Sequence, residues 1–276
     1  MRMILGLIGL TIAAFAAPVS AQNRIPSHCI ALSQSAPGLT YLHQASFREP
    51  VAEARVRISY VDHAMFLIQS EGGTSAMTDF SGFFGNVDFT PDVVTMNNAH
   101  STHWTLYPDP LIPHVLEGWA NADGVRDHYL DLGDMLVRNV HTDTRAEGGR
   151  SRDNGNSIFV FEAAGLCIGH LGHLHQEPSD AQYAALGRMD VVMAAVDGGL
   201  TVDHATLVRV LDRLRSSVVI PMHWFGRRTL DGFLADMRES GYAVDERTDS
   251  TLTLSLSDLP PVRTVIVLEP SFLADQ

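Results

Sequence analysis

The chain has 276 residues, of which 45% are hydrophobic and 18% are charged, and its formal net charge at pH 7 is −13. This length and composition are those of one large globular domain or two small ones. The acidic balance argues against nucleic acid and anionic membrane surfaces as partners, because both carry negative charge. We therefore expect a small-molecule substrate or ligand.

The first 21 residues have the pattern of a secretory signal peptide. A short basic start precedes an apolar run from Ile4 to Ala17, and Val19-Ser20-Ala21 fits a small-x-small cleavage site. The run is shorter than the ~20 residues that a membrane span needs, although an uncleaved anchor is the alternative. We expect cleavage before Gln22, a periplasmic or secreted product, and no membrane association after cleavage.

Residues 22–54 are polar, contain Pro and Ser, and show little periodicity, so we expect an N-terminal extension that lies over a single domain spanning 55–276. The chain has two cysteines, Cys29 and Cys167. In an exported protein they would form one disulfide between the extension and the domain. The alternative, left open by the sequence, is a buried Cys167 and a free Cys29.

Strand patterns come first along the chain. Alternating or short apolar runs bounded by glycine and polar residues predict strands at 55–60, 64–68, 75–78, 92–96, 128–130, 135–140, 157–161 and 166–170. Residues 105–125 contain three prolines and are expected to form a lid-like segment. The stretch 142–156 is rich in Gly, Arg and Asp and is predicted to be a loop.

Helices and strands then alternate. Helices are predicted at 179–186, 201–215 and 230–240, with strands at 190–194 and 217–221 between them and two final strands near 251–256 and 264–268. Strand-rich, then alternating, then strand-rich order predicts an α/β fold in which two sheets are packed between helices, a four-layer αββα sandwich.

The chemistry is expected from histidines, of which there are 13. Several follow directly after predicted strands, and loops at one edge of a layered α/β fold converge in space. Zinc is commonly held by three or four such side chains. The candidate metal ligands are His100, His103, His141, His173 and His223. We expect about one Zn²⁺ per chain, or another divalent ion in its place.

Several motifs, in the same order, resemble the metallo-β-lactamase superfamily and, within it, the branch of ascorbate-phosphate lactonases. Residues 60–68 resemble the branch's opening Gly-His-Ala/Ser-x-Phe-x-Ile, 98–103 occupy the place of His-x-His-x-Asp-His, 170–174 resemble His-x-Gly-Asp-x, and 220–224 resemble Ile-Pro-Met-His-Tyr. The resemblance implies a metal-dependent hydrolase with the αββα fold, and it implies that His100, His103 and His223 are metal ligands, with His141 as a further candidate.

Three positions depart from those motifs. Asn98 replaces a histidine ligand, Thr102 replaces an aspartate, and His173 replaces the aspartate that bridges two metals. Two close dications without carboxylate neutralisation repel each other, so we expect a mononuclear site. Its ligands would be some combination of His100, His103, His173 and His223, with His141 as an auxiliary group. Four protein ligands would instead close the site and make it structural.

Asp79, Asn98 and Thr102 are the candidate catalytic residues, with Asp79 in the role of the missing water-orienting aspartate; Asp62 and Asp197 are alternatives for that role. Together these patterns predict an exported zinc-dependent hydrolase that acts on an ester, lactone, amide or phosphoester through a metal-bound hydroxide. The alternative is a non-catalytic protein of the same fold, with a structural metal or a periplasmic metal-binding role.

Overall fold

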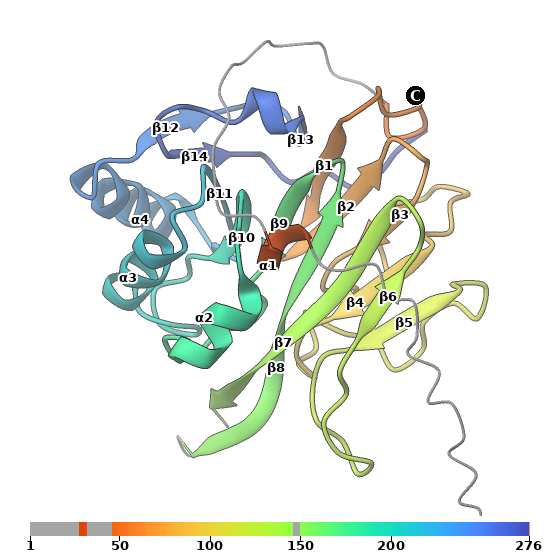
Figure 1. Cartoon of the computed structure of the whole chain (residues 1–276), viewed down its shortest axis with the longest axis horizontal. Coiled ribbons are helices and arrows are strands. Elements are labelled where there is room, and N and C mark those ends of the chain that lie inside the picture. Colours follow the sequence, from red (N-terminus) through yellow and green to blue (C-terminus); the bar gives the residue numbers. More distant parts are fainter. Residues whose placement is uncertain (1–27, 32–45, 146–149, 276) are drawn as a thin grey trace, which may run out of the picture.

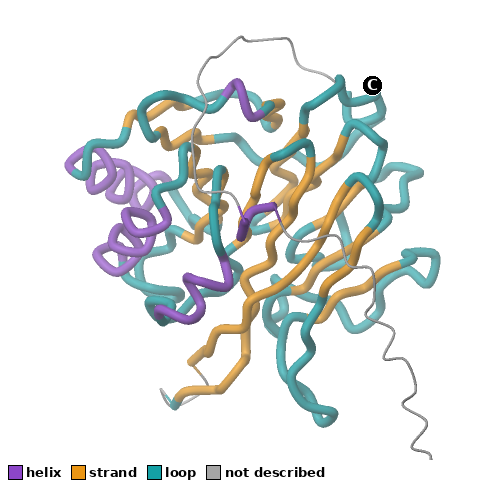
Figure 2. Tube along the Cα trace, in the orientation of Figure 1, coloured by secondary structure: helices purple, strands orange, loops and turns teal. Residues whose placement is uncertain are grey.

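A computed structural model of the chain describes residues 28–31, 46–145 and 150–275. The predicted signal peptide and much of the predicted N-terminal extension lie outside these residues. None of the helices in the described ranges is long and apolar enough to span a membrane. Two sheets dominate the structure, and the helices between residues 180 and 239 gather on one side of it (Figures 1 and 2).

The first sheet has six strands, in the spatial order β13-β1-β2-β3-β4-β5. Its strands are β13 (Thr251–Leu254), β1 (Val56–Asp62), β2 (Met65–Ser70), β3 (Ser75–Met77), β4 (Val93–Met96) and β5 (His114–Glu117). The first four are antiparallel neighbours, whereas β3, β4 and β5 run parallel. Because β3 and β4 are parallel, the residues that follow them leave the sheet at the same edge.

The second sheet has eight strands, in the order β12-β14-β11-β10-β9-β8-β7-β6. They are β12 (Ala243–Glu246), β14 (Thr264–Val267), β11 (Val218–Met222), β10 (Val191–Ala195), β9 (Leu166–His170), β8 (Ser151–Ala163), β7 (Met135–Arg145) and β6 (Tyr129–Asp131). Strands β9, β10 and β11 are parallel and fully buried, which explains their nearly continuous apolar sequences.

The helices are α1 (His28–Ala31), α2 (Asp180–Leu186), α3 (His204–Leu214) and α4 (Arg227–Glu239), with a 3-10 turn η2 (Leu256–Asp258). Side-chain alternation along β8 divides the core into two layers. Phe159 and Phe161 face the other sheet, whereas Ile158 and Val160 pack in the layer that also contains Leu207 of α3. The α/β class with two packed sheets is therefore confirmed.

Loops cover the other face of the six-stranded sheet. Phe80, Phe84 and Trp104 pack there against Met77 and Val94 of the sheet. An open cleft of about 700 Å³ lies among these loops and is lined by residues from Phe80 to Ile112. The expected fourth layer is thus built from loop segments in the described part of the chain, because the apolar residues between 80 and 112 lack helical spacing.

The prediction of a loop at 142–156 is wrong for most of that stretch. Strands β7 and β8 continue through it as one long antiparallel hairpin, with Thr142 opposite Asn156 and Arg145 opposite Ser151. Thr142 and Thr144 are buried, and Asn156 Nδ2 donates to Thr142 Oγ1 at 2.8 Å. Cross-strand pairing and these hydrogen bonds outweigh the turn-like composition.

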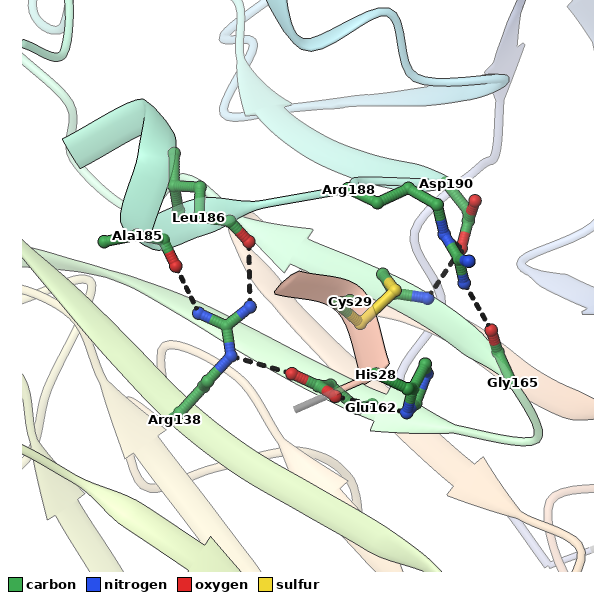
Figure 3. The surroundings of a disulfide bond; sticks show 10 residues. His28, Cys29, Arg138, Glu162, Gly165, Ala185, Leu186, Arg188 and Asp190 are labelled. Carbon is green, nitrogen blue, oxygen red and sulfur yellow. Dashed lines mark hydrogen bonds and ion pairs between the residues drawn. A yellow bond between two sulfur atoms is a disulfide. The ribbon is translucent and has the colours of Figure 1, made fainter. Parts of the chain in front are cut away.

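A disulfide joins Cys29 of α1 to Cys167 of β9, which resolves the alternative that the sequence left open (Figure 3). Beside it, the buried Arg138 donates to Glu162 and to the carbonyl oxygens of Ala185 and Leu186 at the end of α2. The disulfide and this ion pair therefore attach α1 and α2 to the outer face of the eight-stranded sheet.

Candidate metal centre

The candidate site lies where strands of both sheets end. His63 occupies the turn between β1 and β2, Asp79 follows β3, and His223 follows β11. All three have a positive φ, of 45°, 41° and 61° respectively. Non-glycine residues adopt this left-handed conformation rarely, at a cost of about 1–3 kcal/mol, and such strain concentrates at functional sites. The backbone conformation at these three positions therefore sets the direction of their side chains.

His103 is held by a buried carboxylate. Its Nδ1 lies 2.6 Å from Asp79 Oδ2, and both side chains are completely buried. Asp79 Oδ1 also accepts a hydrogen bond of 2.9 Å from the backbone N–H of Asn97. Burial raises the pKa of Asp79 to about 6, so the group is mainly ionised at neutral pH. An ionised Asp79 accepts the Nδ1 proton and leaves the Nε2 lone pair of His103 available.

His223 has a similar arrangement with Asp197. His223 Nδ1 lies 3.0 Å from Asp197 Oδ2, which is an ion-pair distance without the geometry of a hydrogen bond, and both side chains are buried. Burial opposes ionisation of Asp197, but His223, Thr201 and the backbone N–H of Gly199 outweigh it and lower the pKa of the carboxyl. Asp197 is therefore ionised, and it turns Nε2 of His223 toward the interior of the site.

The two Nε2 atoms of His103 and His223 lie 3.1 Å apart. Because His103 Nδ1 faces Asp79, the tautomer with its proton on Nδ1 leaves a lone pair on Nε2, and the carboxylate of Asp197 beside His223 Nδ1 favours the same tautomer there. A cation between two such lone pairs would satisfy both, whereas without a cation one Nε2 would have to carry a proton and donate it to the other. Two nitrogens bound to one tetrahedral zinc ion at about 2.05 Å would be ~3.3 Å apart, which is close to the observed spacing.

His63 completes the group. His63, His103 and His223 each place one ring nitrogen in a group of three atoms that lie within 4.8 Å of one another. His63 Nε2 is buried and has no hydrogen-bond partner among the described residues, whereas the His63 carbonyl accepts from Tyr60 Oη at 2.6 Å and from the His223 N–H at 2.8 Å. An orphaned, buried imidazole nitrogen beside two available lone pairs fits a metal ion.

The clustered imidazoles favour their neutral forms. Burial, together with the neighbouring His223 and His103, lowers the pKa of His63 to about 3. Burial also lowers the pKa of His103 well below its ordinary value, with His223 adding to the effect. Since a histidine must be neutral to bind a metal, the folded protein keeps these residues ready as ligands.

His100 and His173 border this group. The His173 ring lies 4.8 Å from that of His103 and 5.3 Å from that of His223, and the His100 ring lies 5.5 Å from His173. His173 Nδ1 is 2.6 Å from His175 Nε2. Of the five candidate ligands, His100, His103, His173 and His223 are thus brought together.

His141 has other neighbours. Its ring nitrogens contact Asp127 Oδ1 at 3.1 Å and Ser157 Oγ at 3.2 Å, and none of its described contacts is with a clustered imidazole. Its assignment as a ligand stays a prediction. His63, by contrast, is not among the metal ligands that the sequence predicts, and its unusual φ is a property that sequence spacing does not reveal.

The three candidate catalytic residues occupy different places. Asp79 lies under the site as the partner of His103. Asn98 is buried and forms an isolated β-bridge with Asn156, which ties the two sheets together. Thr102 is exposed, and its Oγ1 lies 3.2 Å from His100 Nδ1. Asp79 therefore orients a candidate ligand, and Thr102 contacts His100 at the surface.

The rim of the site carries apolar groups. Phe225 is 66% exposed, and its ring lies 5.4 Å from that of His63 and 5.3 Å from that of His223. Leu200 is 59% exposed and belongs to the turn whose backbone N–H groups donate to Asp197. An apolar portion of a ligand would have contacts here beside the imidazoles.

This chain is similar to several proteins of known sequence or structure. A curated relative from Methanospirillum hungatei, named UPF0173 metal-dependent hydrolase, is 24% identical over 208 residues, which cover 70% of this chain and 93% of the relative. A UPF0173 protein of Pyrococcus abyssi is 21% identical and covers 66% of this chain and 91% of its own length.

A solved structure from Thermotoga maritima, assigned as a Zn-dependent hydrolase of the metallo-β-lactamase superfamily, matches with a TM-score of 0.58 and 26% identity over 78% of this chain and 99% of that one. Igni18, a metallo hydrolase from Ignicoccus hospitalis, shares the fold with a TM-score of 0.53 and 16% identity over 79% of this chain and 96% of its own.

Residues 57–223 match the family described as the beta-lactamase superfamily domain. The matched segment begins in β1 and ends at His223, so it contains all the imidazoles of the cluster. Since it also covers more than half of the chain, this protein belongs to the beta-lactamase superfamily domain family and has the fold of the metallo-β-lactamases.

Proposed function

We propose that this protein is an exported, zinc-dependent hydrolase whose metal is held by His63, His103 and His223. The observation that carries the proposal is the convergence of these three imidazoles, with the Nε2 atoms of His103 and His223 3.1 Å apart and their Nδ1 atoms against buried carboxylates. Carboxylate-held histidines are the usual outer support of protein metal sites. The family relatives named as metal-dependent hydrolases support the same reading.

Three histidine ligands leave one position of a tetrahedral zinc ion open, which is the pattern of catalytic rather than structural sites. A zinc ion bound here would supply a Lewis acid that polarises a carbonyl or phosphoryl oxygen and lowers the pKa of a coordinated water. Asp79 fixes the orientation and tautomer of His103, and the carboxylate of Asp197 beside His223 Nδ1 favours the same tautomer of His223. The histidine set favours zinc over magnesium or calcium, which prefer oxygen ligands.

The apolar rim supports a substrate with a hydrophobic part. Phe225 is exposed beside His63 and His223, Leu200 is exposed on the turn that holds Asp197, and both would shield such a group from water. Among the expected classes of ester, lactone, amide and phosphoester, this environment favours neutral carboxylic esters and lactones. An anionic phosphoester would need a cationic partner, and the nearby Arg145 instead donates to His175 and to carbonyl oxygens.

Export to the periplasm or secretion is part of the proposal. It is supported by the signal-peptide pattern of the first 21 residues and by the disulfide between Cys29 and Cys167. Structural disulfides persist in oxidising compartments and are rare in the cytosol of mesophiles. The acidic chain supports a small-molecule substrate rather than a nucleic acid or an anionic membrane.

The test is hydrolysis by the signal-free protein, stripped with a chelator and then loaded with one equivalent of zinc. A panel of aliphatic esters, lactones, amides and phosphoesters is assayed beside His223→Ala. We expect turnover of at least one ester or lactone that requires zinc and falls at least ~100-fold in the variant. Zinc bound without turnover above the His223→Ala level would contradict the proposal and favour a non-catalytic metal-binding protein.

A further inference from the structure

A row of three hydrogen-bonded side chains leads from the surface to the clustered imidazoles: Arg145, His175 and His173. Arg145 Nε donates to His175 Nδ1 at 2.8 Å, and His175 Nε2 lies 2.6 Å from His173 Nδ1. The same guanidinium donates to the carbonyl oxygens of Gly199, Leu200 and Thr201, so its position is fixed by several contacts.

The arginine determines which atom donates in both hydrogen bonds of this row. An arginine only donates, so Nδ1 of His175 must accept and must carry a lone pair. The proton of His175 is then on Nε2, and it is donated to Nδ1 of His173. Because Nδ1 of His173 accepts, the proton of His173 is on Nε2. The arginine therefore sets the tautomer of an imidazole two hydrogen bonds away.

His173 occupies the border of the candidate metal centre. Its ring is in edge contact with those of His103 and His223, at 4.8 and 5.3 Å, but it does not belong to the group of ring nitrogens that lie within 4.8 Å of one another. Its backbone N–H donates to Asn156 Oδ1 at 2.9 Å, which fixes the loop. No described residue is hydrogen-bonded to its Nε2, and this atom is not fully buried.

We propose that His173 is an N–H donor to substrate, held in the Nε2–H tautomer by the Arg145–His175 relay, and that it is not a metal ligand. An Nε2–H group has no lone pair for a metal, but it is suited to bind an ester or lactone oxygen on which negative charge develops. His173 is then a catalytic residue, and Arg145 and His175 are positioning residues. The role in catalysis rests on the proposed hydrolase function, whereas the tautomer and the exclusion from the ligand set do not.

The first measurement is zinc affinity, by competition with a chelating dye. His173→Ala is expected to bind zinc within ~3-fold of the unaltered protein, whereas His103→Ala, the matched control inside the ligand set, is expected to lose at least ~100-fold. A loss of tenfold or more in His173→Ala would overturn the proposal, because it would make His173 a ligand. This readout needs no turnover, so it separates a failure here from a failure of the hydrolase function.

The second measurement is the tautomer, by long-range ¹H–¹⁵N correlation spectra of the histidine rings, with and without zinc. We expect His173 and His175 as Nε2–H tautomers in both states, and mixed tautomers in Arg145→Met. The control Arg213→Met, which removes an exposed arginine paired with Asp180, should leave the tautomers unchanged. An Nδ1–H tautomer of His173, or a zinc-induced loss of its Nε2 proton, would overturn the proposal.

The third measurement is kcat and KM of the His173 variants on the ester or lactone that the unaltered protein hydrolyses fastest. Removal of one oxyanion donor lowers kcat by about 10²–10³-fold. We expect a fall of that size in His173→Ala with little change in KM, and partial rescue in His173→Gln, whose amide keeps an N–H donor. Unchanged kcat in His173→Ala would overturn the catalytic role.

Discussion

The two carboxylates beneath the imidazoles differ in how they are stabilised. Asp79 receives one backbone hydrogen bond and is fully buried, and burial raises its pKa to about 6. Asp197 accepts from three backbone N–H groups and from Thr201 Oγ1, and its pKa is lowered despite burial. Asp79 is thus the more readily protonated partner, and His103 depends on it for its orientation.

Substitution of Asp79 by asparagine is expected to weaken zinc binding. Asparagine has nearly the same shape and can still accept from the Asn97 N–H, but it lacks the charge that holds the Nδ1 proton of His103. Loss of such a carboxylate partner lowers metal affinity by about 10–100-fold. Zinc titration of Asp79→Asn, beside the surface control Asp231→Asn, checks this; equal affinities in the two variants would contradict the role given to Asp79.

For single residues, the sequence predicted that histidines form the site, but it did not predict the complete set of histidines that lie together. His100, His103, His173 and His223 do lie together, because each follows a strand or lies in a loop at the same edge of the sheets. His63 was not among the predicted ligands because its approach to His223 depends on the contact between the β1–β2 turn and the end of β11. That contact joins residues 160 positions apart and has no local pattern.

Among the elements, β7 and β8 show why a composition-based loop prediction failed. Gly, Arg and Asp between 142 and 156 are typical of turns, yet Thr142, Thr144 and Asn156 are buried on the paired strands. Elsewhere the apolar runs of β9, β10 and β11 and the spacing of α3 and α4 predicted the elements well, because burial on one or both faces leaves a periodic pattern. Strands β5 and β12 are short and partly exposed, and they were missed.

The disulfide is expected to stabilise the attachment of α1. It closes a segment with a sequence separation of 138 residues, for which the chain-entropy contribution is about 3–5 kcal/mol. Reduction should lower Tm by roughly 5–10 °C. Calorimetry with and without reductant checks this, with the double variant Cys29→Ala and Cys167→Ala as the control that reductant does not affect. A Tm of the unaltered protein that is insensitive to reductant would contradict the expectation.

The ion pair under α2 is expected to be sensitive to loss of one partner. Arg138 and Glu162 are buried, and Arg138 also satisfies two carbonyl oxygens at the end of α2. Arg138→Leu leaves a buried carboxylate without its guanidinium, which costs about 3–5 kcal/mol. Urea unfolding measures the change. The exposed pair Arg213–Asp180 provides the control, since Arg213→Leu should change stability by less than about 1 kcal/mol.

For the whole molecule, the arrangement of strands explains why so many polar groups are buried at one edge. In the first sheet, β3 runs parallel to β4, and in the second sheet β9, β10 and β11 are parallel to one another. The segments that follow these strands therefore meet at the same edge. The two sheets are joined there by the bridge between Asn98 and Asn156 and by the hydrogen bond from the Ser157 N–H to the Asn97 carbonyl. The site is therefore built on rigid elements of both sheets.

Burial of neutral imidazoles makes the metal-free protein sensitive to acid. The pKa values of His63, His173 and His175 are lowered from 6.5 to about 3, 2 and 4, chiefly by burial. Groups with a lowered folded pKa contribute stability that is present above the unfolded pKa of 6.5 and is lost as pH falls toward the folded values. Asp79, whose pKa is raised to about 6, acts in the opposite direction below that pH, but it is one group against three.

We therefore expect Tm of the metal-free protein to fall by about 5 °C or more between pH 7.5 and pH 5. Thermal unfolding followed by circular dichroism at several pH values measures this. The double variant His173→Asn and His175→Asn should show a smaller dependence, because it lacks two of the three groups. A Tm that stays constant, or rises, as pH falls over this interval would contradict the assignment of buried neutral imidazoles.

The most direct test of the metal centre is the zinc content of the purified, signal-free protein and of five single variants. We expect about one zinc per chain in the unaltered protein, loss of zinc in His63→Ala, His103→Ala and His223→Ala, and retention in His100→Ala and His141→Ala. Elemental analysis after dialysis against a weak chelator gives these values. Retention of zinc in His63→Ala with loss in His100→Ala, or no zinc in the folded unaltered protein, would contradict the three-histidine site.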